Sequence, residues 1–330
     1  MGFITWAAKC SRHQVLLGEG KSSMFRCQRY AQRAGAPLER LSQDARIVFQ
    51  ADAQALERVG VLVAAASDRG CVREQNEDYL GIYAPPSDIP QDVGLLAVLA
   101  DGMGGHAAGE IASELAVSTI AATFYQTDLA SDADTPGDGT IKPDRRLYAA
   151  FLAADRAIRR AGKRSPDRVG MGCTCIAAVL SEDEITLAHV GDTRAYLVQP
   201  VIGSSGKPDR RWSTIRQLTT DHSLAAELVR VGLLAEGEAQ NSPRRHMVTR
   251  ALGGSPGGPV CAPEIHTLRL RADDILVLCC DGLWSLVSDE QIATAVQEEA
   301  SLDHACATLV ELARQAGGKD NISLMLLAVR

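Results

Sequence analysis

The sequence predicts an α+β fold in which antiparallel strands form sheets and helices cover them. Short apolar runs of strand length recur along the chain, and several are joined by turns short enough for hairpins. Two amphipathic segments, 107–126 and 144–161, follow the third strand, and two more, 289–299 and 303–316, precede the last. Strands and helices grouped in this way are typical of an α+β domain.

The apolar runs predict strands at residues 59–66, 79–83, 95–100, 173–180, 184–189, 194–199, 212–218, 275–280 and 322–329. The turns at 181–183 and 191–193 join three of these strands and suggest an antiparallel meander. Residues 201–211, which contain Gly, Ser and Pro, are expected to form a loop. A further helix is expected over 224–233.

Composition and charge indicate a globular chain. Hydrophobic residues make up 46% of the 330 residues, and the formal net charge is −7. This acidity argues against nucleic-acid binding and fits a protein that gathers carboxylates around cations. No apolar run approaches the roughly 18 residues that a spanning helix needs, so we expect no membrane span.

The nine cysteines are odd in number and contain no Cys-x-x-Cys pair. Cys173, Cys175, Cys279 and Cys280 lie within apolar strands, where a free thiol behaves as a small hydrophobic side chain. We therefore expect buried free thiols rather than disulfides or a zinc site, which indicates a reducing, cytoplasmic location.

Residues 1–60 differ from the rest of the chain. They hold nine Lys and Arg against five acids, a charge of +4, which leaves −11 for residues 61–330. We expect residues 1–60 to be an N-terminal extension that is poorly ordered or partly helical, with any helix over 38–59. A docking arm, or translation upstream of the true start, is the alternative.

Three aspartates stand at the ends of apolar strands. Asp101 and Asp281 each end a strand and precede a glycine, and Asp320 comes just before the last strand. Carboxylates beside free backbone carbonyls suit a hard divalent cation, whereas a single such aspartate could equally cap the following helix. Three of them could converge on one metal cluster, although only the fold can bring them together.

Five blocks resemble, in order, the motifs of the bacterial metal-dependent serine/threonine protein phosphatases of type 2C. They are Ser-Asp-Arg-Gly-x-Val-Arg-x-x-Asn-Glu-Asp at 67–78, Asp-Gly-Met-Gly-Gly-His at 101–106, His-Val-Gly-Asp-Thr-Arg-Ala-Tyr-Leu at 189–197, Cys-Asp-Gly-Leu at 280–283 and Asp-Asn-Ile-Ser at 320–323. The resemblance covers residues 61–330, which we expect to be the catalytic domain. It implies two antiparallel sheets packed as a sandwich with helices on both outer faces.

The resemblance also implies a centre of two Mg²⁺ or Mn²⁺ ions. Asp101 would bridge both ions, the Gly102 carbonyl would bind one, and Asp281 and Asp320 would bind the other. Asp192 could share a third, weaker ion with Asp281, or could simply cap a tight turn.

Other residues of the matching blocks would serve the substrate. Arg73 carries a planar fork that can grip two phosphate oxygens, although alone it would more often form a surface ion pair. Glu77 and Asp78 would face the metals, partly through water. By the same resemblance, 234–263, with five glycines and four prolines, would form a mobile flap beside the active site. His189 is expected to be a hydrogen-bonded structural histidine.

Two positions depart from the family pattern. Cys173 stands where relatives usually have threonine, a change that concerns packing. Met103 stands where many eukaryotic relatives have a histidine considered to protonate the leaving group, so the proton donor here is unassigned, and water is the expected substitute.

The expected activity is hydrolysis of phosphoserine and phosphothreonine in proteins by a metal-bound water, without a covalent intermediate. The expected partners are phosphorylated proteins, a bacterial Ser/Thr kinase and its targets, and we expect a monomer. The alternative is a catalytically inactive regulatory binding module, which a lost metal aspartate would reveal.

Overall fold

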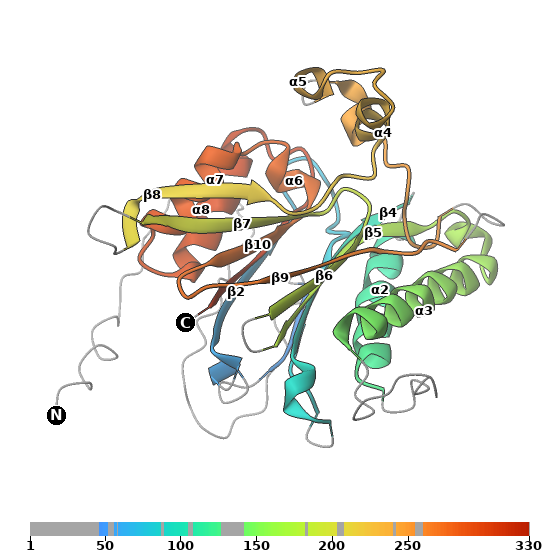
Figure 1. The fold of residues 1–330 in the computed structure, drawn as a ribbon. Coiled ribbons are helices and arrows are strands. Elements are labelled where there is room, and N and C mark those ends of the chain that lie inside the picture. Colours follow the sequence, from blue (N-terminus) through green and yellow to red (C-terminus); the bar gives the residue numbers. More distant parts are fainter. Residues whose placement is uncertain are drawn as a thin grey trace, which may run out of the picture.

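The computed structural model describes residues 46–51, 56–57, 59–86, 89–104, 108–126, 142–181, 184–202, 208–239, 242–254 and 260–329. Within these residues the strands form two sheets that pack face to face (Figure 1). The first sheet has the strand order β1 (Ile47–Gln50), β3 (Tyr79–Tyr83), β4 (Leu95–Met103), β5 (Gly172–Ser181), β6 (Glu184–Val190), β9 (Glu264–Arg269). The second has the order β2 (Val61–Asp68), β11 (Ile322–Val329), β10 (Ile275–Cys279), β7 (Arg194–Ile202), β8 (Pro208–Gln217).

Helices cover the outer face of each sheet. The long helices α2 (Ala108–Phe124) and α3 (Pro143–Lys163) lie against the first sheet, and α7 (Asp289–Glu298) and α8 (Leu302–Gln315) lie against the second (Figure 1). The described part also contains α4 (Leu224–Arg230), α5 (Glu236–Ala239), α6 (Asp281–Trp284) and the short 3₁₀ turns Gln91–Val93, Pro166–Arg168 and Pro243–His246. The predicted α-β-β-α sandwich is confirmed.

Three apolar cores hold these four layers together. One lies between the first sheet and α2 with α3, one between the two sheets, and one between the second sheet and α7 with α8. Strand β4 shows how one strand serves two cores: Leu96 and Val98 enter the helix-facing core, while Leu95 and Leu99 enter the inter-sheet core. A strand buried on both faces needs an uninterrupted apolar run, which is what its sequence provides.

The boundary expected at residue 60 lies too late in the chain. Strand β1 pairs in parallel with β3, and the Arg46 side chain donates hydrogen bonds to the carbonyl oxygens of Asp78 (2.9 Å) and Glu110 (2.8 Å). Residues 47–50 are therefore a strand of the first sheet and not part of a helix over 38–59. Residues 1–45, which the extension prediction also concerns, lie outside the described residues.

The predicted meander is also wrong in one respect. Strands β5 and β6 pair as expected, but β7 belongs to the second sheet, so the chain crosses between the sheets at 191–193. The loop expected over 201–211 is shorter, because β7 extends to Ile202 and β8 begins at Pro208. Strand β9, which was not predicted, pairs with β6 at the edge of the first sheet.

None of the described helices combines the length and the apolar character that crossing a membrane requires.

Truncation tests where the catalytic fold begins. Deleting residues 1–45 keeps β1 and Arg46, so hydrolysis of a small phosphomonoester should stay within a few-fold of the full chain. Deleting 1–55 removes both, and we expect a lower melting temperature and reduced activity, because β3 loses its neighbour and Asp78 loses the Arg46 contact. Equal activity and stability of the two truncations would contradict this boundary.

Candidate metal centre

The end of the inter-sheet core is where the predicted site residues gather. Along β4, Leu95, Ala97 and Leu99 face this core, and Asp101 is the next residue of the same alternation. The strand therefore carries its carboxylate to the point where the apolar contact between the sheets stops.

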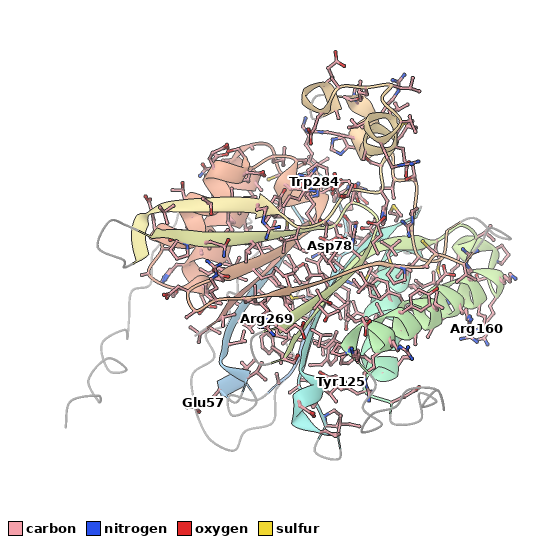
Figure 2. The ribbon with its side chains drawn as sticks, viewed as in Figure 1. Glu57, Asp78, Tyr125, Arg160, Arg269 and Trp284 are labelled. Carbon is pink, nitrogen blue, oxygen red and sulfur yellow. The ribbon has the colours of Figure 1, made fainter. Side chains whose placement is uncertain are left out.

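Two other strands bring polar groups to the same point. On β3, Leu80 and Ile82 face the inter-sheet core, and Asp78 immediately precedes them in the alternation. At the end of β10, Cys280 also enters this core. Ligand atoms of Asp78, Asp101 and Cys280 all lie within 4.8 Å of one another. Figure 2 labels Asp78 between the sheets, on the side of the molecule that faces α4 and α5.

Asp281 and Asp320 lie beside this group. Asp281 is the first residue of α6, directly after β10, and Asp320 lies just before β11, the antiparallel neighbour of β10. A Cβ added at Gly282 would lie 1.9 Å from the Asn321 carbonyl oxygen, so only glycine lets these two segments approach. Both aspartates line a pocket of about 170 Å³. We call Asp78, Asp101, Asp281 and Asp320 the carboxylate cluster.

Burial and mutual repulsion raise the pKa values of carboxyl groups in this cluster. The pKa of Asp101 is raised well above its ordinary value, by burial and then by the charges of Asp78, Asp281, Asp192 and Asp320. Burial raises the pKa of Asp78 to about 7. Both carboxylate oxygens of Asp78 are buried and lack a regular hydrogen-bond partner among the described residues. Converging carboxylates with unused oxygens fit divalent cations, whose charge would offset the repulsion.

The Cys280 thiol is not suited to be a ligand. Burial, followed by the charge of Asp78, raises its pKa well above the ordinary value, so it stays protonated. Its Sγ donates to the Asn321 carbonyl oxygen at 3.2 Å and accepts from the Ser323 backbone N–H at 3.1 Å. Cys280 therefore joins β10 to β11 beneath the cluster.

Arg73 reaches the rim of the cluster. Its Nη2 donates to Asp320 Oδ2 at 2.7 Å, and its side chain is 48% exposed. This hydrogen bond raises the pKa of Arg73, although burial opposes the rise. Glu77, the neighbour of Asp78, has a pKa raised by burial. The structure thus brings Arg73 and Glu77 to the site, while their predicted roles toward phosphate and metal-bound water stay predictions.

The structural role of Asn321 was not predicted from the sequence. Its Oδ1 accepts the Glu77 backbone N–H at 2.8 Å, and its Nδ2 donates to the carbonyl oxygens of Arg69 (3.0 Å) and Gln75 (2.9 Å). One buried amide thus holds the loop that carries Arg73. Its place directly after Asp320 in a recognised motif was the available signal.

Gly102 occupies a position that only glycine can fill. An added Cβ would lie 2.3 Å from the Gly109 carbonyl oxygen and 2.6 Å from that of Glu77. The strand end, the start of α2 and the Glu77 loop therefore meet without side chains between them. Metal binding by the Gly102 carbonyl stays a prediction.

Asp192 lies at the turn where the chain crosses between the sheets. It is 3% exposed, and burial followed by the charge of Asp281 raises its pKa to about 7. Its backbone oxygen accepts the Trp284 Nε1–H at 2.9 Å. Asp192 is therefore close enough to Asp281 for their charges to interact, which a third ion would require.

Residues 224–239 and 242–250, which carry α4 and α5, belong to a segment that projects beyond the sandwich (Figure 1). The same segment contacts the cluster. Within it, His246 Nδ1 lies 3.7 Å from Asp281 Oδ2, and the His246 ring stacks on Trp284 with centroids 5.9 Å apart. The guanidinium carbon of Arg245 also lies over the Trp284 ring, 5.9 Å from its centroid. Arg245 and His246 both line the pocket with Asp281 and Asp320. Arg245 and His246 both lie within 234–263, where the family resemblance implies a flap. His246 was not predicted as a site residue, since a lone histidine in a loop carries no periodic signal.

A pH series tests the burial of the Asp192 charge in metal-free protein. With a pKa of about 7 against an ordinary value of about 4, the folded state binds more protons than the unfolded state across this range. The contribution of Asp192 to the stability of the folded protein therefore falls as pH rises. The Tm of Asp192→Asn minus that of the wild type should increase between about pH 4 and 7 and stay constant at higher pH. Thermal unfolding in EDTA measures this difference, and a difference constant from pH 5 to 8 would contradict it.

Comparison with known proteins agrees with this geometry. Residues 66–322 match the family model described as Protein phosphatase 2C. The chain is 31% identical over 261 residues to serine/threonine phosphatase stp of Listeria welshimeri, covering 79% of this chain and 93% of that protein.

Solved structures give the same result. The serine/threonine phosphatase of S. agalactiae superimposes with a TM-score of 0.67 at 31% identity, covering 82% of this chain and all of that one. The catalytic domain of PstP in complex with 2 manganese ions gives a TM-score of 0.60 at 33% identity, covering 81% of this chain and 97% of that one. The chain therefore belongs to the protein phosphatase 2C family, as its sequence motifs predict.

Proposed function

We propose that this protein hydrolyses phosphoserine and phosphothreonine in proteins, using divalent cations held by the carboxylate cluster. The observation that carries the proposal is the convergence of four aspartates from separate strand ends, with both Asp78 oxygens buried and, among the described residues, without a regular hydrogen-bond partner. A bound cation would offset this repulsion without requiring the buried carboxylates to take up protons.

Mg²⁺ or Mn²⁺ are the cations that this all-oxygen donor set fits. The related PstP domain in complex with 2 manganese ions supports two bound ions. Here they would be held by Asp101, the Gly102 carbonyl, Asp281 and Asp320. Such ions supply Lewis acidity and a water of lowered pKa for attack on phosphorus. Asp192, buried and facing the charge of Asp281, would contribute to a third site.

Arg73 is placed to hold the substrate phosphate. Its Nη2 is used by Asp320, which fixes the guanidinium at the rim of the cluster, and a guanidinium has five N–H donors in all. The exposed donors can take two phosphate oxygens in a planar fork. Arg73 thereby orients the phosphate and offsets the charge that develops on its oxygens.

A wider groove beside the pocket suits a polypeptide substrate. It has a volume of about 960 Å³ and runs between the segment carrying α4 and α5 and the start of α7. Its walls carry charge of both signs, from residues that include Arg194, Arg245, Glu227, Glu236 and Glu290. Such a groove can contact residues around a phosphorylated side chain. The substrates we propose are phosphoproteins, among them a Ser/Thr kinase and its targets.

Peptide specificity tests this function. With Mn²⁺, the full chain should release phosphate from phosphothreonine and phosphoserine peptides, and more slowly from a matched phosphotyrosine peptide. A catalytically inactive binding module would bind these peptides without turnover. That alternative has no support in the sequence, because Asp101, Asp281 and Asp320 are all present. Absence of turnover with every peptide at saturating Mn²⁺ would overturn the proposal.

A further inference from the structure

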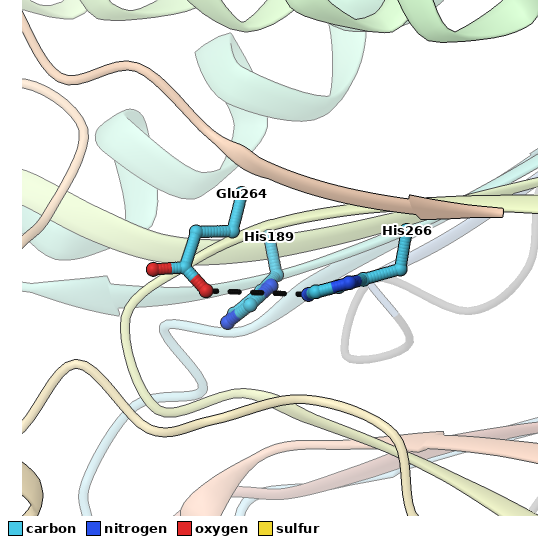
Figure 3. A group of neighbouring side chains, drawn as sticks. All are labelled: His189, Glu264 and His266. Carbon is cyan, nitrogen blue, oxygen red and sulfur yellow. Dashed lines mark ion pairs between the residues drawn. The ribbon is translucent and has the colours of Figure 1, made fainter.

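A second group of metal-ligating side chains lies where β6 meets β9. His189 is directly opposite Glu264 in this antiparallel pair, and His266 is opposite Leu187, two residues along each strand. The three polar side chains therefore share one face of the sheet. Figure 3 shows them pointing toward one another, with His189 between the other two. One ligand atom of each lies within 4.8 Å of the others.

His189 has an unused nitrogen aimed into this group. Its side chain is fully buried, and its Nδ1 has no hydrogen-bond partner among the described residues. Its Nε2 lies 3.0 Å from the Thr220 carbonyl oxygen, which can only accept, so Nε2 carries the proton and Nδ1 presents a lone pair. Burial lowers the pKa of His189 to about 4, which keeps the ring neutral. Metal-ligating histidines typically donate their second N–H to a backbone carbonyl in this way.

Glu264 is held in position by a second histidine. His222 Nδ1 accepts the Gly191 backbone N–H at 3.0 Å, which leaves the proton of the neutral ring on Nε2, 3.0 Å from Glu264 Oε1. Arg250 Nη1 lies 2.9 Å from the same nitrogen. Arg250 Nη1 also contacts Glu264 Oε1 at 3.2 Å. The other oxygen, Oε2, faces His266 Nε2 at 4.0 Å. Arg250 weakens the attraction of Glu264 for a cation, but Oε2 stays available as a ligand.

We propose that His189, Glu264 and His266 form a binding site for a transition-metal cation of the Zn²⁺ type, separate from the carboxylate cluster. Two imidazoles and a carboxylate select Zn²⁺ and its neighbours over Mg²⁺, which prefers oxygen ligands only. The ligand atoms of a tetrahedral zinc site lie about 3.3 Å apart, given Zn–N distances of about 2.0–2.1 Å. The ligand atoms, now within 4.8 Å of one another, would have to approach by up to about 1.5 Å. His266 and Glu264, whose side chains are 48% and 40% exposed, can do so by changing rotamer.

A cation bound here would tie β9 to β6 at the edge of the first sheet. Arg250, the last residue of the segment that carries α4 and α5, contacts Glu264 directly. The proposed metal site therefore also adjoins this segment. We therefore expect Zn²⁺ at stoichiometric amounts to raise the Tm of the protein.

Cobalt is the probe, because four-coordinate Co²⁺ absorbs strongly in the visible range and replaces zinc in such sites. The full chain, freed of metal, is titrated with Co²⁺ alongside Asp281→Asn, in which the carboxylate cluster is impaired. Both should bind one four-coordinate Co²⁺, and millimolar Mg²⁺ should not displace it. A spectrum of six-coordinate Co²⁺ alone in the wild type would overturn the proposal.

Single variants locate the site. His266→Ala and Glu264→Gln change half-exposed side chains and should fold normally, and each should lose more affinity than the roughly 10- to 100-fold typical of a second-shell change. His304→Ala, an exposed histidine on α8, is the matched control and should bind Co²⁺ as the wild type does. Unchanged affinity in His266→Ala, with circular dichroism showing a folded protein, would overturn the assignment.

Discussion

Asp101→Asn should abolish phosphatase turnover while leaving the protein folded. The substitution keeps the side-chain size but removes a charge from the centre of the carboxylate cluster, where four other aspartates act on it. A catalytic metal contributes several kcal/mol to transition-state stabilisation, and each ~1.4 kcal/mol is a factor of ten in rate. We expect kcat to fall by at least roughly a thousandfold, measured as phosphate release from a phosphothreonine peptide with Mn²⁺.

A second ligand variant and a control variant accompany this test. Asp281→Asn should behave in the same way, whereas Asp167→Asn, an exposed aspartate in the turn after α3, should keep wild-type activity. In metal-free protein Asp101→Asn should also raise Tm, because it removes the repulsion that raises the pKa of Asp101. Full activity in Asp101→Asn or Asp281→Asn would refute their assignment as metal ligands.

Substitutions of Arg73 separate phosphate recognition from metal binding. Arg73→Ala removes both the positive charge and the planar guanidinium group, whereas Arg73→Lys keeps the charge but cannot bind two phosphate oxygens in a planar, bidentate way. Hydrogen bonds to charged groups are each worth about 1.5–3 kcal/mol, so Arg73→Ala should lower kcat/KM on the order of ten- to a hundredfold or more. Arg73→Lys should fall between Arg73→Ala and the wild type.

Calorimetry decides how Arg73 acts. Manganese affinity should change little in Arg73→Ala, since Arg73 is not a ligand. Because Arg73 also holds Asp320 at 2.7 Å, lost manganese binding together with lost activity would instead make it a positioning residue for that ligand. The control is Arg160→Ala, an exposed arginine on α3 that Figure 2 labels far from Asp78. If Arg73→Ala keeps the wild-type kcat/KM, Arg73 does not bind the phosphate, and its contact with Asp320 is only a surface ion pair.

The sequence predicted the layers of this fold well because its long strands are unambiguous. Strand β4 has six apolar residues in a row, and β11 follows the same pattern, so each could be placed to within a few residues. The edge strands β1 and β9 were missed, since four residues or a half-exposed, mostly polar hexapeptide carry too little pattern. Membership of β7 in the second sheet depends on pairing between distant segments, which no local pattern encodes.

The site was predicted unevenly for a similar reason. Asp101, Asp281 and Asp320 stood out because an apolar strand stops or starts beside each of them. Asp78 was expected, from the family resemblance, to face the metals partly through water, and the alternation of β3 places it, fully buried, beside Asp101. His246 approaches Asp281 only because its segment folds back over α6, a contact between residues 35 positions apart in the chain.

The dependence of turnover on metal tests the central claim most directly. Phosphate release from a phosphothreonine peptide is measured in Mn²⁺, after removal of the metal with EDTA, and after Mn²⁺ is restored. Because the carboxylate cluster is proposed to act through bound cations, activity should vanish in EDTA and return with Mn²⁺. Undiminished turnover in EDTA, by protein shown to be free of metal, would contradict the account.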